Sequence, residues 1–185
     1  MTGFEDTPWL LALIGIGVVL LAWFVWRRFF GRGNALERAL ADISYERIEN
    51  LVIPGADEGE ILVDQLLLTS QGLLILETKD VQGAVFGGDK MSDWTVIAQD
   101  RRYTFRNPQP ALYDRIAAVR QIVRQVPVDG RVVFLDGAEF TKGVPSLVCN
   151  LEQLVSEFGE PDKEAARSKI EAFKPHWELI VRRAD

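Results

Sequence analysis

Two carboxylates and a lysine lie on two neighbouring apolar runs of the sequence. The stretch 61–79 reads ILVDQLLLTSQGLLILETK, with Asp64 in the first run and Glu77 and Lys79 at the end of the second. Two apolar runs separated by Thr-Ser-Gln-Gly predict a hairpin of antiparallel strands. With the turn centred on residues 70–71, Asp64 falls opposite Glu77, and directly opposed residues have Cβ atoms roughly 4.5–5.5 Å apart. Lys79 lies two residues beyond Glu77 and therefore points to the same face.

This arrangement of charges favours a metal site. Two like charges on one face of an apolar sheet are unfavourable unless a positive charge lies between them. A divalent cation that prefers hard oxygen ligands would supply that charge, and Lys79 would add a third polar group. The alternative is an edge-strand charge at Asp64, with Glu77 and Lys79 forming an ion pair on a solvated surface. The neighbours on the same face count against it, because they are apolar: Leu66, Leu68, Leu73 and Ile75.

The flanking sequence predicts the elements that position these residues. Asn34 can cap a helix that runs to about residue 49, and Glu37 lies in its first turn, where a carboxylate also suits the helix dipole. Further strands are predicted at 84–86, 94–97, 102–105, 131–135 and 146–149. Further helices are predicted at 111–125, 151–158 and 162–173. Together these elements predict an α/β fold, in which a mixed sheet is flanked by helices.

The segment from residue 101 to residue 131 is the one strongly basic part of an acidic chain. It holds seven arginines against Asp114 and Asp129, whereas the whole chain carries a net charge of −6. A phosphate backbone could be received here, beside the carboxylates. The alternative is an ordinary solvated helix face. The arginines expected to contact nucleic acid are Arg101, Arg102, Arg106 and Arg115.

Residues 9–26 form a continuous uncharged apolar segment. As a helix it would be about 27 Å long, close to the ~30 Å hydrocarbon core of a bilayer. Arg27 and Arg28 follow at once, which predicts a single-pass anchor in the cell inner (cytoplasmic) membrane, with the N-terminus outside and the following domain in the cytoplasm. The alternative is a buried core helix. The predicted organisation is therefore a transmembrane anchor with its basic flank at 1–32 and a second domain at 33–185.

The remaining composition excludes several kinds of site. Cys149 is the single cysteine and His176 the single histidine. An intramolecular disulfide framework, a cysteine-based zinc site and a histidine-dependent triad are therefore excluded.

Asp64 followed by Glu77-Thr78-Lys79 resembles the D…ExK core of the PD-(D/E)xK nuclease superfamily. More narrowly, residues 34–123 resemble the nuclease-related domain known as NERD, through VDQLLLTSQGLLILETKDVQG, then Trp94 and the YTFRNP segment. The resemblance implies a restriction-endonuclease-like fold and a nuclease acting on DNA or RNA. It implies that Asp64, Glu77 and the Thr78 carbonyl hold Mg²⁺, with Mn²⁺ as a substitute.

Within this resemblance, Lys79 would orient the attacking water or help to deprotonate it. Glu37 would contribute through a water or a second metal. The chain departs from the family pattern at Leu36, Gln65 and Ala111, which stand where glycine, histidine and glutamine are usual. These departures leave two alternatives open. One is a catalytically degenerate, membrane-tethered module that binds nucleic acid or protein, and the other is a membrane-anchored scaffold whose carboxylates pair with arginines.

Overall fold

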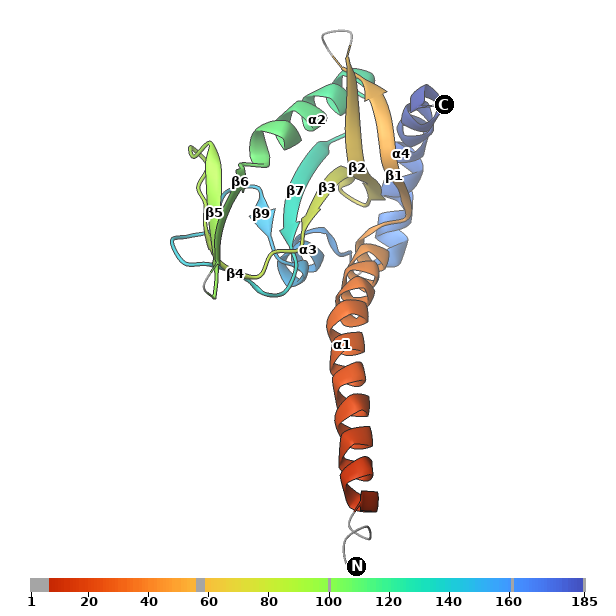
Figure 1. The fold of residues 1–185 in the computed structure, drawn as a ribbon. Helices are drawn as coiled ribbons and strands as arrows, with labels where there is room; N and C mark the ends of the chain where they lie inside the picture. The colour runs from red at the N-terminus through yellow and green to blue at the C-terminus, as the bar shows by residue number, and fades with distance from the viewer. Residues whose placement is uncertain (1–6, 56–58, 100, 161, 185) are drawn as a thin grey trace, which may run out of the picture. The chain divides into compact units, whose positions relative to one another are not determined.

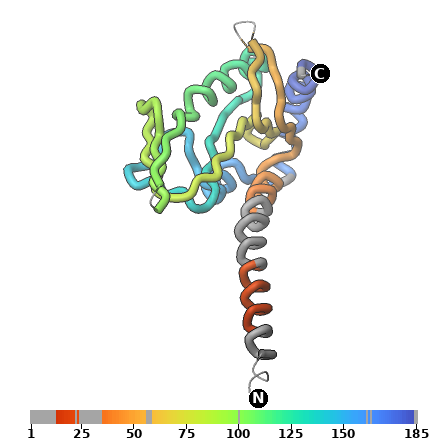
Figure 2. Tube along the Cα trace, in the orientation of Figure 1, coloured from red at the N-terminus to blue at the C-terminus, as the bar shows by residue number. Residues whose placement is uncertain are grey.

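The computed structural model describes residues 7–55, 59–99, 101–160 and 162–184 (Figure 2). Within these ranges, the side chains at 7–12, 22, 24–34, 163 and 184 are not described. The chain divides into two compact units, Met1–Glu37 and Arg38–Asp185. The second unit contains all of the strands and three of the four helices of the described chain.

A single helix, α1, runs from Thr7 to Ile43. The sequence predicted two separate helical segments here, but Asn34 is internal to the helix and does not cap it. Within the residues that the structure describes, no helix is both long enough and apolar enough to cross a membrane. The predicted transmembrane helix at 9–26 is therefore not found in that part of the chain, and the side chains at 9–12, 22 and 24–26 lie outside it.

The predicted C-terminal end of this helix, at residue 49, is wrong. The helix ends at Ile43, where the Ser44 hydroxyl donates a 2.6 Å hydrogen bond to the Leu40 carbonyl. The Tyr45 amide then donates to the Leu68 carbonyl, and β1 begins at Glu46. Pairing with the next strand satisfies the backbone groups of this segment, and it outweighs the helical pattern of its side chains.

The first sheet has five strands in the order β1-β2-β3-β7-β9 (Figure 1). Its strands are β1 (Glu46–Pro54), β2 (Glu60–Thr69), β3 (Gly72–Lys79), β7 (Val128–Phe134) and β9 (Val148–Cys149). The pairs β1–β2 and β2–β3 are antiparallel, whereas β3–β7 and β7–β9 are parallel, so the sheet is mixed as predicted. Both faces of β3 are buried, which explains its nearly continuous apolar sequence.

The second sheet was not predicted. The sequence predicts one mixed sheet, but four strands form another mixed sheet in the order β6-β5-β4-β8. These strands are β4 (Gly83–Phe86), β5 (Asp93–Ala98), β6 (Arg101–Arg106) and β8 (Ala138–Phe140). Trp94, fully buried, joins the two sheets: its ring stacks on Phe134 at the end of β7 and meets Phe105 and Phe140 edge-on.

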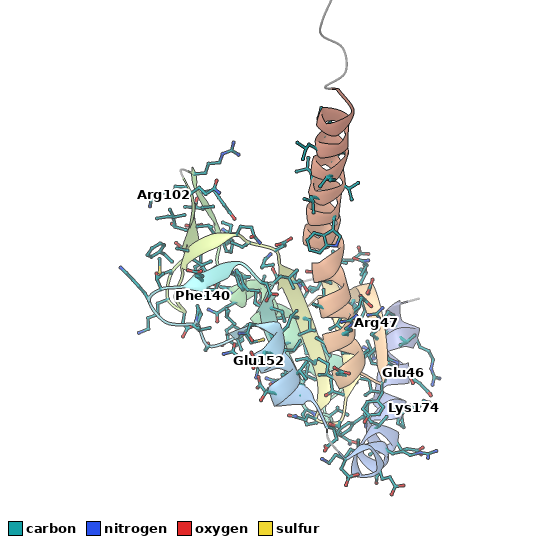
Figure 3. The ribbon with its side chains drawn as sticks, turned by 90° about the horizontal axis from the view of Figure 1, so that it is seen from below. Glu46, Arg47, Arg102, Phe140, Glu152 and Lys174 are labelled. Atoms are coloured by element: carbon teal, nitrogen blue, oxygen red, sulfur yellow. The ribbon has the colours of Figure 1, made fainter. Side chains whose placement is uncertain are left out.

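The three remaining helices cover the first sheet (Figure 1). They are α2 (Gln109–Ile122), α3 (Leu151–Phe158) and α4 (Lys163–Ala184). α2 packs over β7, where Gly130 leaves room for the side chains of Leu112 and Ile116. α3 has its predicted bounds, and α4 runs past its predicted end at residue 173 with Pro175 inside it. Figure 3 shows Lys174 of α4 beside Glu46 of β1, and these two side chains form an ion pair of 3.6 Å.

Candidate active site

The β2–β3 hairpin has the register that the sequence predicted. Thr69 pairs with Gly72, and the ladder continues as far as Gln65 opposite Leu76. The Thr69 hydroxyl donates a 2.9 Å hydrogen bond to the Gly72 carbonyl, and Gly72 has φ 130°, which favours glycine at this turn. Asp64 and Glu77 are the next residues on each strand beyond the last pair. By strand alternation, both side chains lie on the face of Leu66 and Ile75.

Glu77 is the centre of a charged cluster on this face. Its Oε1 lies 2.7 Å from Lys79 Nζ, and its Oε2 lies 3.1 Å from Arg115 Nη1. The Glu77 side chain is only 10% exposed, whereas those of Arg115 and Lys79 are 19% and 33% exposed. A carboxylate that is buried this deeply needs a partner to compensate for its lost hydration. Here each oxygen of Glu77 faces a cation.

Arg115 joins α2 to the strands that carry the two carboxylates. Its Nε donates a 2.7 Å hydrogen bond to the Leu62 carbonyl of β2, while its Nη1 donates to Glu77 of β3. The sequence predicted Arg115 as a contact for nucleic acid and did not foresee either bond. The ion pair with Glu77 is the kind of carboxylate–arginine contact that the scaffold alternative anticipated, and the contact of Arg115 with nucleic acid stays a prediction.

Asp64 is half-buried, and strand alternation places it on the same face of the sheet as Glu77. Among the described residues, its carboxylate makes no hydrogen bond or ion pair, so it differs from Glu77 in having no cation against it. Within the same residues, no three side chains of the His, Cys, Asp or Glu type gather as a metal site. The predicted ligand set therefore contains two carboxylates of this unit, together with the Thr78 carbonyl. Glu37 is the last residue of the first unit, and its part in a metal site stays a prediction.

Two polar groups next to Asp64 and Glu77 in the sequence have no hydrogen-bond partner in the described structure. The Thr78 hydroxyl and the Gln65 amide oxygen are buried, and neither has a hydrogen-bond partner in the described structure. By strand alternation, both side chains lie on the opposite face of the sheet from Glu77. They are therefore separate from the cluster of Glu77, and only the backbone carbonyl of Thr78 belongs to the predicted ligand set.

The other predicted nucleic-acid contacts lie on the second sheet. Arg101, Arg102 and Arg106 are all exposed on β6, which is an edge strand. Figure 3 shows Arg102 at the end of the β5–β6 hairpin. These three arginines therefore form a separate exposed basic strand, whereas Arg115 belongs to the cluster around Glu77.

A groove opens beside Arg115. It has a volume of about 540 Å³ and lies between α2 and the connection from β1 to β2. Its lining includes Glu60, Leu62, Ala111, Asp114, Arg115 and Gln121. Arg115 thus borders both the groove and the Glu77 carboxylate.

A polar network that the sequence did not reveal holds the start of α2. The buried amide of Gln109 donates to Asp89 Oδ1 at 3.1 Å and accepts from the Leu147 amide at 3.0 Å. Asp89 Oδ1 also accepts from the Ser146 amide at 2.8 Å, and this hydrogen bond lowers the pKa of the Asp89 carboxyl. Gln109 therefore has a structural role, because it fixes the end of the helix that carries Arg115. The signal in the sequence was a polar amide beside Asn107-Pro108, at a helix start.

Comparisons with known proteins agree with the resemblance of the sequence. The family model described as the nuclease-related domain matches residues 30–135. An uncharacterized protein of Bacillus anthracis is 24% identical over 82 residues, which make up 44% of this chain and 39% of the relative. The match thus covers well under half of that relative's length, and no solved structure matches the chain. Because the family model matches more than half of the 185 residues, the chain belongs to the nuclease-related domain family.

Proposed function

We propose that the protein is a metal-dependent nuclease that hydrolyses phosphodiester bonds of DNA or RNA. Membership in the nuclease-related domain family supports a nuclease-related function and a nucleic-acid substrate. One structural observation carries the assignment of the site: Glu77 and Lys79 lie 2.7 Å apart on the sheet face that also bears Asp64.

The residues present fit a hard divalent cation. Asp64, Glu77 and the Thr78 carbonyl offer only oxygen donors, which suit Mg²⁺ and also Mn²⁺. A bound metal would lower the pKa of a coordinated water and stabilise charge on the scissile phosphate.

Lys79 is assigned the handling of the attacking water. The Lys79 side chain is one third exposed and its ammonium group lies 2.7 Å from Glu77, so the side chain borders both the solvent and the proposed ligands. From that position its ammonium group would orient the water. Asp64 and Glu77 hold the metal and do not serve as nucleophiles.

We assign Arg101, Arg102 and Arg106 to the phosphate backbone of the substrate, because all three are exposed on one edge strand. Arg102→Gln and Arg106→Gln should each weaken nucleic-acid binding and flatten its dependence on salt. Arg167→Gln, which changes an exposed arginine of α4, is the matched control. Equal affinities for all three variants, measured by fluorescence anisotropy, would contradict the assignment.

We also propose that residues 9–26 anchor the protein in the inner membrane, with the following domain in the cytoplasm. The sequence supports this through its uncharged apolar run and the arginines after it. Eight apolar side chains of α1 are each more than half exposed to solvent: Leu13, Ile14, Ile16, Val18, Val19, Leu20, Leu21 and Trp23. The protein should stay with membranes during extraction at alkaline pH, and its release by that treatment would contradict the proposal.

The catalytic assignment is tested with the whole chain in mild detergent. Labelled single- and double-stranded DNA and RNA are incubated with Mg²⁺ or Mn²⁺, beside Asp64→Ala and Lys79→Ala. Asp93→Ala removes an exposed carboxylate of β5, Lys142→Ala removes an exposed lysine in the turn after β8, and both serve as matched controls. We expect cleavage by the wild type and both controls and none by the other two variants. Equal activity in all five proteins would mean that another site, or a contaminant, is responsible.

The second candidate is a module that binds nucleic acid or protein without cleavage. One observation favours it: both oxygens of Glu77 are already held by protein cations. The same experiment separates the two functions, because the binding module would retain nucleic acid in the presence of metal and leave it intact.

A further inference from the structure

The charged side chains on this face balance in number. Glu77 contacts the two cations Lys79 and Arg115, and Asp64, which contacts neither, adds the second negative charge. Lys79 and Arg115 each lie against one oxygen of Glu77, at 2.7 and 3.1 Å. A divalent cation that binds Asp64 and Glu77 therefore meets two positive charges close to its ligands, and like charges at such distances repel each other.

Of the two cations, Arg115 is the one that can leave. Lys79 follows Glu77 by two residues on the same strand and face, so it stays beside the carboxylate. Arg115 comes from α2 and reaches Glu77 through a long flexible side chain. It also borders the groove of about 540 Å³, whose lining includes the carboxylates of Glu60 and Asp114. The groove gives the guanidinium group both space and negative charge away from Glu77.

We propose that Arg115 is a placeholder cation, which occupies Glu77 in the metal-free protein and moves toward the groove when a divalent metal binds. This inference rests on the proposed function, since it assumes that Asp64 and Glu77 hold a metal. Arg115 is then a positioning residue that sets metal affinity. Its departure also breaks the hydrogen bond to the Leu62 carbonyl, so metal binding releases one tie between α2 and β2.

The opposing interpretation makes Arg115 a permanent brace. A brace would hold β2, β3 and α2 in the geometry that the metal needs, and its loss would weaken metal binding. The placeholder predicts the opposite sign, because its loss removes a competing positive charge. Metal affinity therefore separates the two roles without any measurement of nuclease activity.

The test is isothermal titration calorimetry of Mn²⁺ into the full chain in mild detergent. Arg115→Gln is compared with the wild type and with Arg124→Gln, which removes one exposed arginine charge just after α2. We expect Arg115→Gln to bind Mn²⁺ about tenfold tighter or more, and Arg124→Gln to match the wild type. Arg115→Lys keeps the charge on a different head group, so its affinity should stay close to that of the wild type.

Unchanged or weaker binding by Arg115→Gln, with clear binding by the wild type, would overturn the placeholder and leave the proposed metal site standing. Absence of binding in every protein would overturn both. Tight binding by Arg115→Gln alone would support the placeholder. Thermal unfolding of each variant shows that the compared proteins are folded.

A second measurement follows the side chain itself and needs no variant to function. In the wild type, Arg115 Nε donates a 2.7 Å hydrogen bond to the Leu62 carbonyl. Its ¹H–¹⁵N NMR signal, assigned by its absence from Arg115→Gln, should shift and exchange faster with water when diamagnetic Mg²⁺ is added. A signal that stays unchanged at saturating Mg²⁺ would show that the guanidinium does not move.

Discussion

The ion pair of Glu77 and Arg115 should be measurable as a coupling energy in the metal-free protein. Glu77→Gln removes one charge and keeps the size of the side chain, and Arg115→Gln removes one charge and leaves a shorter polar side chain. The double variant removes both charges. Comparing the free energies of unfolding of the four proteins isolates the interaction of this pair from the other effects of each substitution.

The size of the coupling energy between Glu77 and Arg115 follows from the distance between their charges and from their exposure to solvent. Two opposite unit charges about 4 Å apart attract by about 4 kcal/mol at an effective dielectric constant of about 20. Loss of hydration offsets much of this attraction. Exposed pairs contribute at most about 1 kcal/mol, and disruption of a buried pair costs about 3–5 kcal/mol. Because the Glu77 and Arg115 side chains are 10% and 19% exposed, we expect a coupling of about 1–2 kcal/mol.

The matched comparison is the pair of Glu77 and Lys79. Its distance is shorter, at 2.7 Å, but Lys79 is 33% exposed and its ammonium group keeps more of its water. We therefore expect a smaller coupling, below about 1 kcal/mol. Urea unfolding of the metal-free chain, followed by circular dichroism, gives both values. A coupling for Arg115 that is near zero, or smaller than that for Lys79, would refute the reasoning that burial decides the strength of these contacts.

Three further predictions concern residues outside this pair. Gly87→Ala should destabilise the fold by about 1–3 kcal/mol in urea unfolding, since the new Cβ would lie 2.6 Å from the fully buried ring of Trp94; an unchanged midpoint would contradict this packing. The hydrogen bond from the Ser146 amide lowers the pKa of Asp89, so the ionised carboxylate stabilises the fold above pH about 4, and this stabilisation is lost as the pH falls through the lowered pKa. The free energy of unfolding of Asp89→Asn should therefore fall less steeply with acid than that of the wild type. Burial raises the pKa of Cys149 to about 11, so a thiol reagent at pH 8 should label the protein quickly only after denaturation, and rapid labelling of the folded chain would show that this thiol is accessible.

The hairpin could be predicted from the sequence because its register is local. A short turn fixes which residues face each other, and every further pair follows from strand alternation. Thr69 opposite Gly72 and Leu66 opposite Ile75 are therefore both found as predicted. Strand alternation from this register places Asp64 and Glu77 on one face of the sheet.

The end of α1 and the second sheet depend on partners far away in the chain. Residues 46–49 fit a helical stripe, yet they pair with β2, because Glu46 lies opposite Leu68 across some twenty positions of sequence. The second sheet needs β8, whose three residues pair with Gly83 to Val85, more than fifty positions earlier. Such a short strand has almost no pattern of its own, so its pairing is decided by the packing around Trp94.

Arg115 shows that the sequence predicts on which face of a helix a charged residue lies more easily than it predicts which residue the charge will contact. The helical stripe of Leu112, Ile116 and Val119 correctly indicated the buried side of α2, and these residues are buried. Arg115 lies next to that stripe, where a long side chain can reach either solvent or the sheet beneath. The choice depends on where Glu77 lies under the helix, and this is set by the packing of α2 on Gly130. An arginine beside an apolar stripe should therefore be tested first against carboxylates of the covered sheet, and only then assigned to a substrate.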